Sequence, residues 1–519
     1  MPSEGAYRLA VIALTLVMLS GSVLWALVRP PFSGPDELIH YNSVVRVVAG
    51  GGWPLPYTAR VTDSTVTAAA ESGNAYGGQG MAVLPAPDDR SLLLEGDTWQ
   101  NHGRDQMLQH PPGYYYLLAG VVVALGGPEL RWDHAQLAIR MASGVLLAAS
   151  VPFLVGTARR VTRSRRAGLA GGASALFVAY FANMGGLINN DTLLITACSA
   201  SIYFVVRART SVRARAVLLA ASGIALGVAL LTKGLALLLI PVIVLLAVVA
   251  VARLEVPLFR KALLILLPAA IAFVIGGWWW VRNLILLGKV QPNLLGNRAH
   301  RDIADPAYSL TEFLQSTVLR LNRTFWSLGL PDLYADIAGV ILLAAIVVAI
   351  IVSRERATIA ILWLFPGLVV VTIMLNAHSI FWDTGDPARG IQGRYLFCGI
   401  AALCVTVGCL AQWVARPLGP RARRFGSATF CVAAAAATFA AIAYVFVAEW
   451  GAGSSGVETS ATAHGISTLW YSVVPILGLL ALAGLVTVLL VSPLALDGDR
   501  EPLPVEAGTA AQSLRRTEE

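Results

Sequence analysis

The chain has little charge: only 13% of its 519 residues are Asp, Glu, Lys or Arg. Soluble domains contain about 25% of such residues. Hydrophobic residues instead make up 56% of the chain, and its mean hydropathy is +0.68. Apolar runs near the roughly 20 residues needed to cross hydrocarbon recur along its whole length. These properties exclude an ordinary soluble domain and predict an all-α polytopic membrane protein.

The chain also lacks paired cysteines and a cleavage signal. Its five cysteines fall inside apolar runs without paired spacing, which excludes a disulfide scaffold and a cysteine metal site: Cys198, Cys398, Cys404, Cys409 and Cys431. No Ala-x-Ala sequence precedes Arg29 after the first apolar run, Leu9 to Val28. We therefore expect that run to be an uncleaved membrane anchor.

The net charge of +8 does not indicate a nucleic-acid partner, because the arginines cluster between apolar runs, where positive-inside loops belong. Five clusters are predicted to be cytoplasmic: 159–166, 207–215, 253–261, 354–356 and 416–424. If the N-terminus is also cytoplasmic, an even number of spans must precede the first cluster, yet three apolar runs do. The short run 114–126 is therefore expected to be a re-entrant or interfacial helix that does not cross the membrane. About twelve spans then remain, with both termini cytoplasmic: 9–28, 136–158, 167–187, 192–206, 216–231, 235–252, 262–281, 336–352, 357–377, 395–415, 426–448 and 469–491.

This topology predicts a membrane domain over residues 1–496 with two sizeable external loops. The long first external loop, 29–135, includes a small polar lobe at about 57–110, and the second loop, 282–335, is basic. Residues 497–519 are polar and are expected to form a disordered cytoplasmic tail.

Two adjacent acids, Asp36 and Glu37, follow Pro35 directly after the first span. Pro35 predicts a helix over 36–48, on which Asp36 and His40 share a face while Glu37 is turned away by about 100°. Acids in a first turn complement the helix dipole, which is one interpretation. The other is catalytic, since a carboxylate backed by a histidine serves as a general base or as half of a metal site.

A second acid and an aromatic motif are predicted at the same external face. His110 precedes Pro-Pro-Gly and three tyrosines that include Tyr115. This motif is typical either of a helix start in an aromatic belt or of the mouth of a sugar or lipid groove. Asp191 follows two asparagines where one span ends and the next begins. It either caps that span or faces the same cleft as Asp36.

Cations also lie at the predicted external ends of spans. Lys233 interrupts an apolar stretch, where it either snorkels to the interface or supplies a cation for an anionic group. Arg282, Arg389 and Arg394 stand where the positive-inside rule disfavours arginine. Guanidinium groups at such positions suit phosphate, and ion pairs with nearby acids (Asp383 or Asp386) are the alternative.

Taken in order, these motifs resemble the GT-C superfamily of integral-membrane glycosyltransferases. Within it, they resemble a bacterial subfamily of predicted membrane proteins related to the protein O-mannosyltransferase and aminoarabinose transferase groups. The pieces that carry the resemblance span residues 1 to about 400: Pro35-Asp36-Glu37 with His40, His110-Pro111-Pro112 with Tyr115, Asn190-Asp191, Leu231-Thr232-Lys233, Trp279 with Arg282-Asn283, and Gln392-Gly393-Arg394-Tyr395.

The resemblance implies a GT-C-like fold and an enzyme that moves a sugar, with inversion, from a polyprenyl-phosphate donor to an envelope glycan or lipid. Asp36, Glu37 and Asp191 would be catalytic, with Asp36 as the general base. The substrate would be bound by His40, His110, Tyr115, Lys233, Arg282, Gln392 and Arg394. The resemblance implies a bacterial plasma membrane location with the site on the extracytoplasmic face. No cofactor is implied with certainty, and a divalent metal stays open.

Two other functions fit a polytopic protein with external acids. A transporter or lipid flippase for an envelope precursor is one, because acids near spans also serve as ion sites. A transporter site is expected near the bilayer midplane between repeated halves, whereas the charges of this chain lie near one face. A non-catalytic assembly subunit that keeps the fold is the other.

Overall fold

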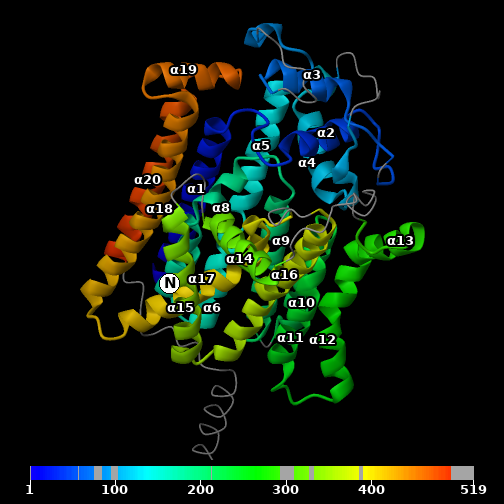
Figure 1. Cartoon of the computed structure of the whole chain (residues 1–519). Coiled ribbons are helices and arrows are strands. Elements are labelled where there is room, and N and C mark those ends of the chain that lie inside the picture. The colour runs from blue at the N-terminus through cyan, green and yellow to red at the C-terminus, as the bar shows by residue number, and fades with distance from the viewer. Residues whose placement is uncertain are drawn as a thin grey trace, which may run out of the picture.

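The computed structural model describes residues 2–56, 58–74, 84–94, 103–211, 213–292, 309–326, 332–384 and 390–492. Within these ranges the chain is helical, and its extended pairing is limited to two isolated bridges, Arg60 with Arg104 and Leu92 with Arg131. The predicted tail, 497–519, lies outside the described residues, as does much of the second external loop. Figure 1 shows the helices gathered into one bundle, with a group of shorter helices at its upper end.

Each of the twelve predicted spans coincides with a helix or a helix pair. The membrane helices and the short elements between them are α1 (Pro2–Val28), α5 (Trp132–Ala148), α6 (Val151–Thr162), α7 (Arg165–Ala173), η5 (Ser174–Phe177), α8 (Ala179–Gly185), α9 (Asp191–Ala208), α10 (Arg215–Leu230), η6 (Gly234–Leu238), α11 (Leu239–Val251), α12 (Leu258–Ala272), η7 (Phe273–Gly277), α13 (Trp278–Leu287), α14 (Leu310–Trp326), α15 (Asp332–Val352), α16 (Arg356–Thr384), η9 (Gly393–Gly399), α17 (Ile400–Ala415), α18 (Pro420–Trp450) and α20 (Trp470–Val491).

By length and composition, ten helices of the described chain could cross a membrane, or eleven if one bent pair is a single span. The bent pair is Arg165–Phe177 with Ala179–Gly185, which turn by 80° at the break. The one predicted span left over, 216–231, corresponds to α10, whose 16 residues are fewer than a full crossing needs. The prediction of an all-helical, multi-pass membrane protein is confirmed.

The short run before α5 is helix α4 (Gly113–Ala124), which has 12 residues. At about 1.5 Å per residue it measures roughly 18 Å, well short of the roughly 30 Å hydrocarbon core. It packs against α2 (Glu37–Val48) and α5 rather than entering the bundle as a span. This agrees with the expected interfacial or re-entrant helix.

The bundle has one continuous hydrophobic core around α1, which packs against α20, α5 and α8. The outer helices contribute much less to this core. In the apolar windows of Leu258–Leu287 and Asp332–Val352, only 11% of the residues are buried inside the protein. Apolar side chains on such surfaces belong in contact with lipid, so their exposure agrees with a membrane protein.

The upper group of helices has a hydrophobic core of its own. It unites α2, α3 (Asp63–Glu71), α4 and the start of α5 around buried rings that include Phe32, Tyr41, Tyr114 and Trp132. The short helices η2 (Pro87–Asp89), η3 (Gln106–Gln109) and η4 (Gly127–Glu129) complete the described part of this group. We call the group over residues 32–132 the upper lobe.

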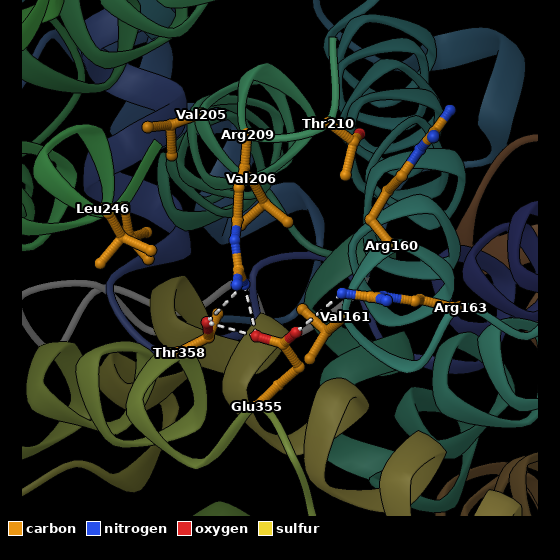
Figure 2. Close-up of a pocket in the computed structure, with 11 residues that line it drawn as sticks. Arg160, Val161, Arg163, Val205, Val206, Arg209, Thr210, Leu246, Glu355 and Thr358 are labelled. Carbon is orange, nitrogen blue, oxygen red and sulfur yellow. Dashed lines mark hydrogen bonds and ion pairs between the residues drawn. The ribbon is translucent and has the colours of Figure 1, made fainter. Parts of the chain in front are cut away.

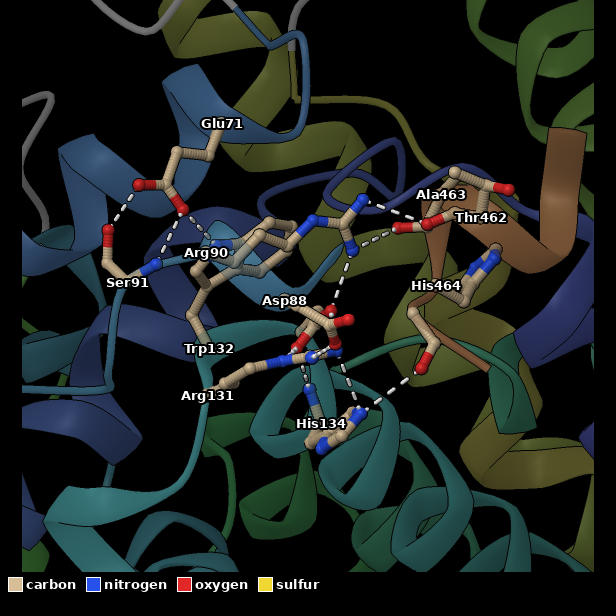
Figure 3. A network of polar contacts seen from close by, with 12 residues as sticks. Glu71, Asp88, Arg90, Ser91, Arg131, Trp132, His134, Thr462, Ala463 and His464 are labelled. Atoms are coloured by element: carbon tan, nitrogen blue, oxygen red, sulfur yellow. Dashed lines mark hydrogen bonds and ion pairs between the residues drawn. The ribbon is translucent and has the colours of Figure 1, made fainter. Parts of the chain in front are cut away.

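A polar network fixes the upper lobe to the bundle (Figure 3). The Arg90 guanidinium donates to Asp133 at the start of α5, at 2.7 Å, and to the carbonyl oxygens of Thr462 and Ala463, at 2.9 and 3.1 Å. These carbonyls lie at the end of α19 (Ser454–Ala463), the helix that crosses the upper end of the bundle in Figure 1. The lobe is thus held from two sides above the helices that carry the candidate site.

Candidate functional site

Asp36 lies between the end of α1 and the start of α2, in the left-handed backbone region with φ of 60°. That region is uncommon for a residue with a side chain, and Asp and Asn tolerate it best. The helix begins at Glu37, one residue later than predicted, and the Asp36 side chain makes no capping bond to it. Its carboxylate is instead 43% exposed and accepts a hydrogen bond of 3.2 Å from Arg394.

Glu37 points away from Asp36 into a buried cluster. Both of its carboxylate oxygens pair with Arg140 of α5, at 2.7 and 2.8 Å, and neither side chain is exposed. Glu37 also accepts hydrogen bonds from the backbone amides of Gly34 and Ile188. Since these amides precede Asp36 and Asp191 respectively, Glu37 holds together the two loops that carry the acids.

Arg140 completes this cluster on the other side. Its remaining N–H groups donate to the carbonyl oxygens of Ala26, Arg29 and Pro30, at 2.7 to 2.9 Å. The end of α1 is thereby fixed, and with it the short segment from which Asp36 emerges. Sequence reasoning missed Arg140, although an arginine inside the apolar run 136–158 is an informative signal, because such residues are costly unless paired.

Asp191 is the first residue of α9 and its side chain is buried. One oxygen, Oδ1, lies 2.6 Å from the ammonium of Lys233, while Oδ2 is buried and has no hydrogen-bond partner in the part of the chain that the structure describes. Lys233 stands in the extended break between α10 and η6, with its ammonium 4.7 Å from the centre of the Tyr395 ring. A buried carboxylate oxygen without a partner is costly, so it marks a place where a ligand can donate.

Arg394 lies between the two acids. It belongs to the first turn of η9, is 3% exposed, and interacts electrostatically with Asp191 as well as with Asp36. Its Nε and Nη1 atoms are buried and have no hydrogen-bond partner among the described residues. A guanidinium with two unused buried donors is a suitable partner for a phosphate.

A close backbone contact positions Lys233 beside the lobe. The Gly113 amide at the start of α4 donates to the carbonyl oxygen of Leu231, at 2.9 Å. A Cβ atom at residue 113 would approach that carbonyl oxygen to 2.7 Å, so only glycine fits there. This contact explains why the Pro-Pro-Gly motif and the Lys233 segment meet.

The predicted histidines and Tyr115 form a wall next to the charged residues. His40 Nδ1 lies 2.9 Å from the Tyr115 hydroxyl, and the Trp53 ring stacks on Tyr115 at 4.7 Å between centroids. Trp53 also donates to the carbonyl oxygen of His110, at 3.1 Å. Burial, reinforced by the positive charge of Lys233, lowers the pKa of His110 to about 3 and that of His40 well below 6.5. Both imidazoles are therefore neutral near pH 7.

Two predicted substrate-binding residues are not joined to this cluster. The Arg282 guanidinium lies 4.6 Å from the centre of the Trp279 ring and donates to Asn283. Gln392 precedes η9 with an extended backbone. Neither forms an ion pair or hydrogen bond with Asp36 or Asp191 in the part of the chain that the structure describes. Arg389 and Asp386 lie outside the described residues.

The sequence left open whether a divalent metal is bound, and the described part of the chain contains no set of ligands for one. There, no group of three or more His, Cys, Asp or Glu side chains is arranged to hold an ion. The cluster instead alternates acids and cations from four separate elements: the α1–α2 segment, α9, the α10–η6 break and η9.

Comparisons with known proteins agree with a membrane protein of this architecture. The sequence model of a family described as "Predicted membrane protein (DUF2142)" matches residues 19–404. This match confirms the predicted resemblance to a subfamily of predicted membrane proteins. None of the curated proteins compared with the chain matches it.

Three solved structures show the range of the structural similarity. ArnT from Cupriavidus metallidurans bound to undecaprenyl phosphate is 17% identical, with 92% of this chain and 76% of that chain covered and a TM-score of 0.47. The oligosaccharyltransferase of Archaeoglobus fulgidus is 11% identical, with 88% and 56% covered and a TM-score of 0.41. The S. cerevisiae protein O-mannosyltransferase Pmt1–Pmt2 complex bound to the sugar donor is 15% identical, with 56% and 34% covered and a TM-score of 0.37.

Proposed function

The chain belongs to the DUF2142 family of predicted membrane proteins, and we propose that it is a glycosyltransferase of the GT-C type. Its donor is a sugar on a polyprenyl phosphate, and its acceptor is an envelope glycan or lipid outside the cytoplasm. One observation carries the proposal: two acids and two cations from distant segments meet at one end of the bundle with buried atoms left unpartnered.

The cations suit the leaving group of such a reaction. A polyprenyl phosphate keeps its tail in lipid and its phosphate at the interface, and the phosphate gains negative charge as the sugar departs. Arg394 has two unused donors, and Lys233 stands across Asp191 from it. Cations already in place where charge develops are the usual main source of transition-state stabilisation.

The acid suited to proton removal is Asp36, because it is half-exposed and, among the residues that the structure describes, pairs with Arg394 alone. When a donor phosphate engages Arg394, the hold of Arg394 on Asp36 weakens. Asp36 then accepts the proton of an acceptor hydroxyl while that oxygen forms a bond to the anomeric carbon. The bond from that carbon to the phosphate oxygen breaks, and the phosphate leaves with the electron pair. A single displacement of this kind inverts the anomeric centre.

The other acids have different parts in this proposal. Asp191 holds Lys233 through Oδ1 and offers Oδ2 to a sugar hydroxyl. Glu37 is a positioning residue rather than a catalytic one, since Arg140 and two amides occupy its carboxylate.

His40, His110 and Tyr115 form a neutral wall that suits the sugar or the acceptor. Contact of Arg282 and Gln392 with the substrate remains a prediction, as does the placement of this site on the extracytoplasmic face of a bacterial plasma membrane.

The test is sugar transfer by the purified full-length protein in lipid nanodiscs, with a panel of radiolabelled polyprenyl-phosphate sugars and a membrane extract as acceptor. We expect wild-type transfer from one donor and near-background transfer by Asp36→Asn. Asp89→Asn is the matched control, because Asp89 is an exposed acid of the same lobe away from the site. Near wild-type transfer by Asp36→Asn would remove Asp36 from this role. A bound but unmoved sugar would instead favour the transporter.

A further inference from the structure

A charged cavity lies near the end of α9 that is opposite to Asp191, and Figure 2 shows the residues that line it. Helix α9 connects the candidate site to this cavity, since the helix begins at Asp191 and ends at Ala208, just before the cavity residue Arg209. Its 18 residues span about 27 Å, close to the thickness of the hydrocarbon core. The cavity is thus at the other membrane surface, the one that the positive-inside rule assigns to the cytoplasm.

In this cavity, arginines from two of the predicted cytoplasmic clusters meet an acid from a third, Glu355. Arg163, at the end of α6, donates to Glu355 at 3.3 Å, and Arg209 forms a second ion pair with the same carboxylate. Thr358 also donates to Glu355, at 3.3 Å. Figure 2 shows both guanidinium groups directed toward Glu355, while that of Arg160 points away from it. One carboxylate therefore balances two fixed cations, which leaves this group with a net charge of +1.

The two arginines remain accessible to a ligand. The Arg163 and Arg209 side chains are 35% and 31% exposed, and Glu355 is 16% exposed. Each guanidinium has five N–H donors in a planar fork, and within the described residues its hydrogen bonds to Glu355 and Thr358 use only one or two of them. An incoming phosphate can therefore bind both forks alongside the carboxylate or in its place.

Part of the cavity wall is aliphatic. Val205 and Val206 of α9 and Leu246 of α11 line it together with the arginines, and Leu246 is almost fully buried. A wall of this kind next to a cationic rim matches a molecule with an anionic head and a hydrocarbon portion. Basic pockets between transmembrane helices on the cytoplasmic side are known to bind anionic lipid head groups.

We propose that this cavity binds the phosphate of an anionic lipid from the cytoplasmic leaflet, with Arg163 and Arg209 as the phosphate ligands and Glu355 as their internal competitor. A soluble phosphate has the same head-group chemistry but no group to occupy the aliphatic wall. This binding site is separate from the proposed transferase site, and testing it requires no turnover.

Native mass spectrometry of the full-length protein in a neutral detergent tests the proposal. Dioleoyl phosphatidylglycerol is titrated, with dioleoyl phosphatidylcholine and inorganic phosphate as comparison ligands. We expect phosphatidylglycerol to bind more tightly than either, and Arg163→Gln and Arg209→Gln each to weaken it about five-fold, the usual effect of one basic side chain near an anionic surface. Arg416→Gln, an exposed arginine at the same surface outside the cavity, should bind as wild type does.

Glu355→Gln gives the decisive readout, because it should tighten phosphatidylglycerol binding several-fold by removing the competing carboxylate. A misfolded variant cannot gain affinity, so this result is free of that ambiguity. The proposal is overturned if Arg209→Gln binds as wild type does, or if Glu355→Gln binds more weakly. Displacement of the lipid by an equal concentration of inorganic phosphate would show a soluble anion as the ligand and would overturn the lipid assignment.

Discussion

Two neighbouring residues, Asp36 and Glu37, each pair with an arginine, and the two pairs differ in almost every other respect. The Glu37–Arg140 pair is bidentate, buried on both sides, and further hydrogen-bonded to backbone groups of three segments. The Asp36–Arg394 pair has one contact of 3.2 Å, a half-exposed acid, and a guanidinium with two unused donors.

The contrast indicates that the two adjacent acids have different roles: Glu37 supports the structure, whereas Asp36 is available for chemistry. A buried pair whose bonds are all made cannot exchange partners without a large penalty, so it suits a permanent support. A pair with spare donors and solvent access can exchange partners when a ligand arrives. In this chain the support lies directly behind the exchangeable pair and sets its position.

The largest effect is expected when the support is broken. Arg140→Met leaves the Glu37 carboxylate buried without its cation, which should lower the free energy of unfolding by about 3–5 kcal/mol and abolish activity with it. Chemical denaturation in detergent measures the change. Arg29→Met is the control, since the Arg29–Glu449 pair is partly exposed and its loss should cost at most about 1 kcal/mol. Equal losses in the two variants would contradict the role of the Glu37–Arg140 pair as a support.

The exchangeable pair should behave in the opposite way. Asp36→Asn should lower kcat by about 10²–10⁴ because the general base is lost. Its free energy of unfolding should change by less than about 1 kcal/mol, since Asp36 is half-exposed and makes a single contact of 3.2 Å with Arg394. The two measurements on one purified variant test this separation. A stability loss as large as that of Arg140→Met would place Asp36 with the support instead.

Replacing Arg394 tests the exchangeable pair through the affinity for the donor. Arg394→Gln should weaken binding of a polyprenyl-phosphate sugar by about 10- to 100-fold, because hydrogen bonds to charged groups are worth about 1.5–3 kcal/mol. Equilibrium binding of a labelled donor in nanodiscs measures this. Arg104→Gln, which removes an exposed cation of the lobe, should leave the affinity unchanged. Donor affinity that is unaffected in Arg394→Gln would exclude Arg394 as the phosphate ligand.

The histidine wall gives the smallest effect, a pH dependence of stability. Burial lowers the pKa of His40 in the folded protein, so as the pH falls below about 6.5 the unfolded chain takes up a proton that the folded chain does not. The unfolding temperature should therefore drop between pH 7 and pH 5, and it should drop less in His40→Gln. Since neither His40 nor His110 of the folded protein titrates in this range, activity should show no histidine step between pH 6 and pH 8. A step near pH 6.5 would contradict the neutral wall.

Most of the fold was accessible from the sequence because hydrocarbon thickness and the positive-inside rule are strong constraints. They placed a helix or helix pair at every predicted span and marked 114–126 as too short. The break in the third span was missed, because the 80° bend after Phe177 lies within a run that remains apolar throughout. Periodicity and length carry no information about such a bend.

For the site, the sequence indicated which residue types were unusual but not how they pair. Asp36, Asp191, Lys233 and Arg394 were singled out because charge at the ends of apolar runs is rare, and the structure brings them together; their catalytic and binding roles stay predictions. The partnership of Glu37 with Arg140 spans about a hundred residues, so neither local spacing nor helix phase could reveal it. Sequence reasoning therefore grouped Glu37 with Asp36.

The left-handed backbone at Asp36 restricts which residues that position accepts in related chains. A side chain without a local polar group pays roughly 1–2 kcal/mol to adopt this conformation, whereas Asn, Asp and Gly adopt it readily. Relatives that have lost the carboxylate should thus carry Asn or Gly there in preference to Ala or Val. An alignment in which position 36 is Asp, Asn or Gly would identify family members that retain the left-handed turn but lack the carboxylate.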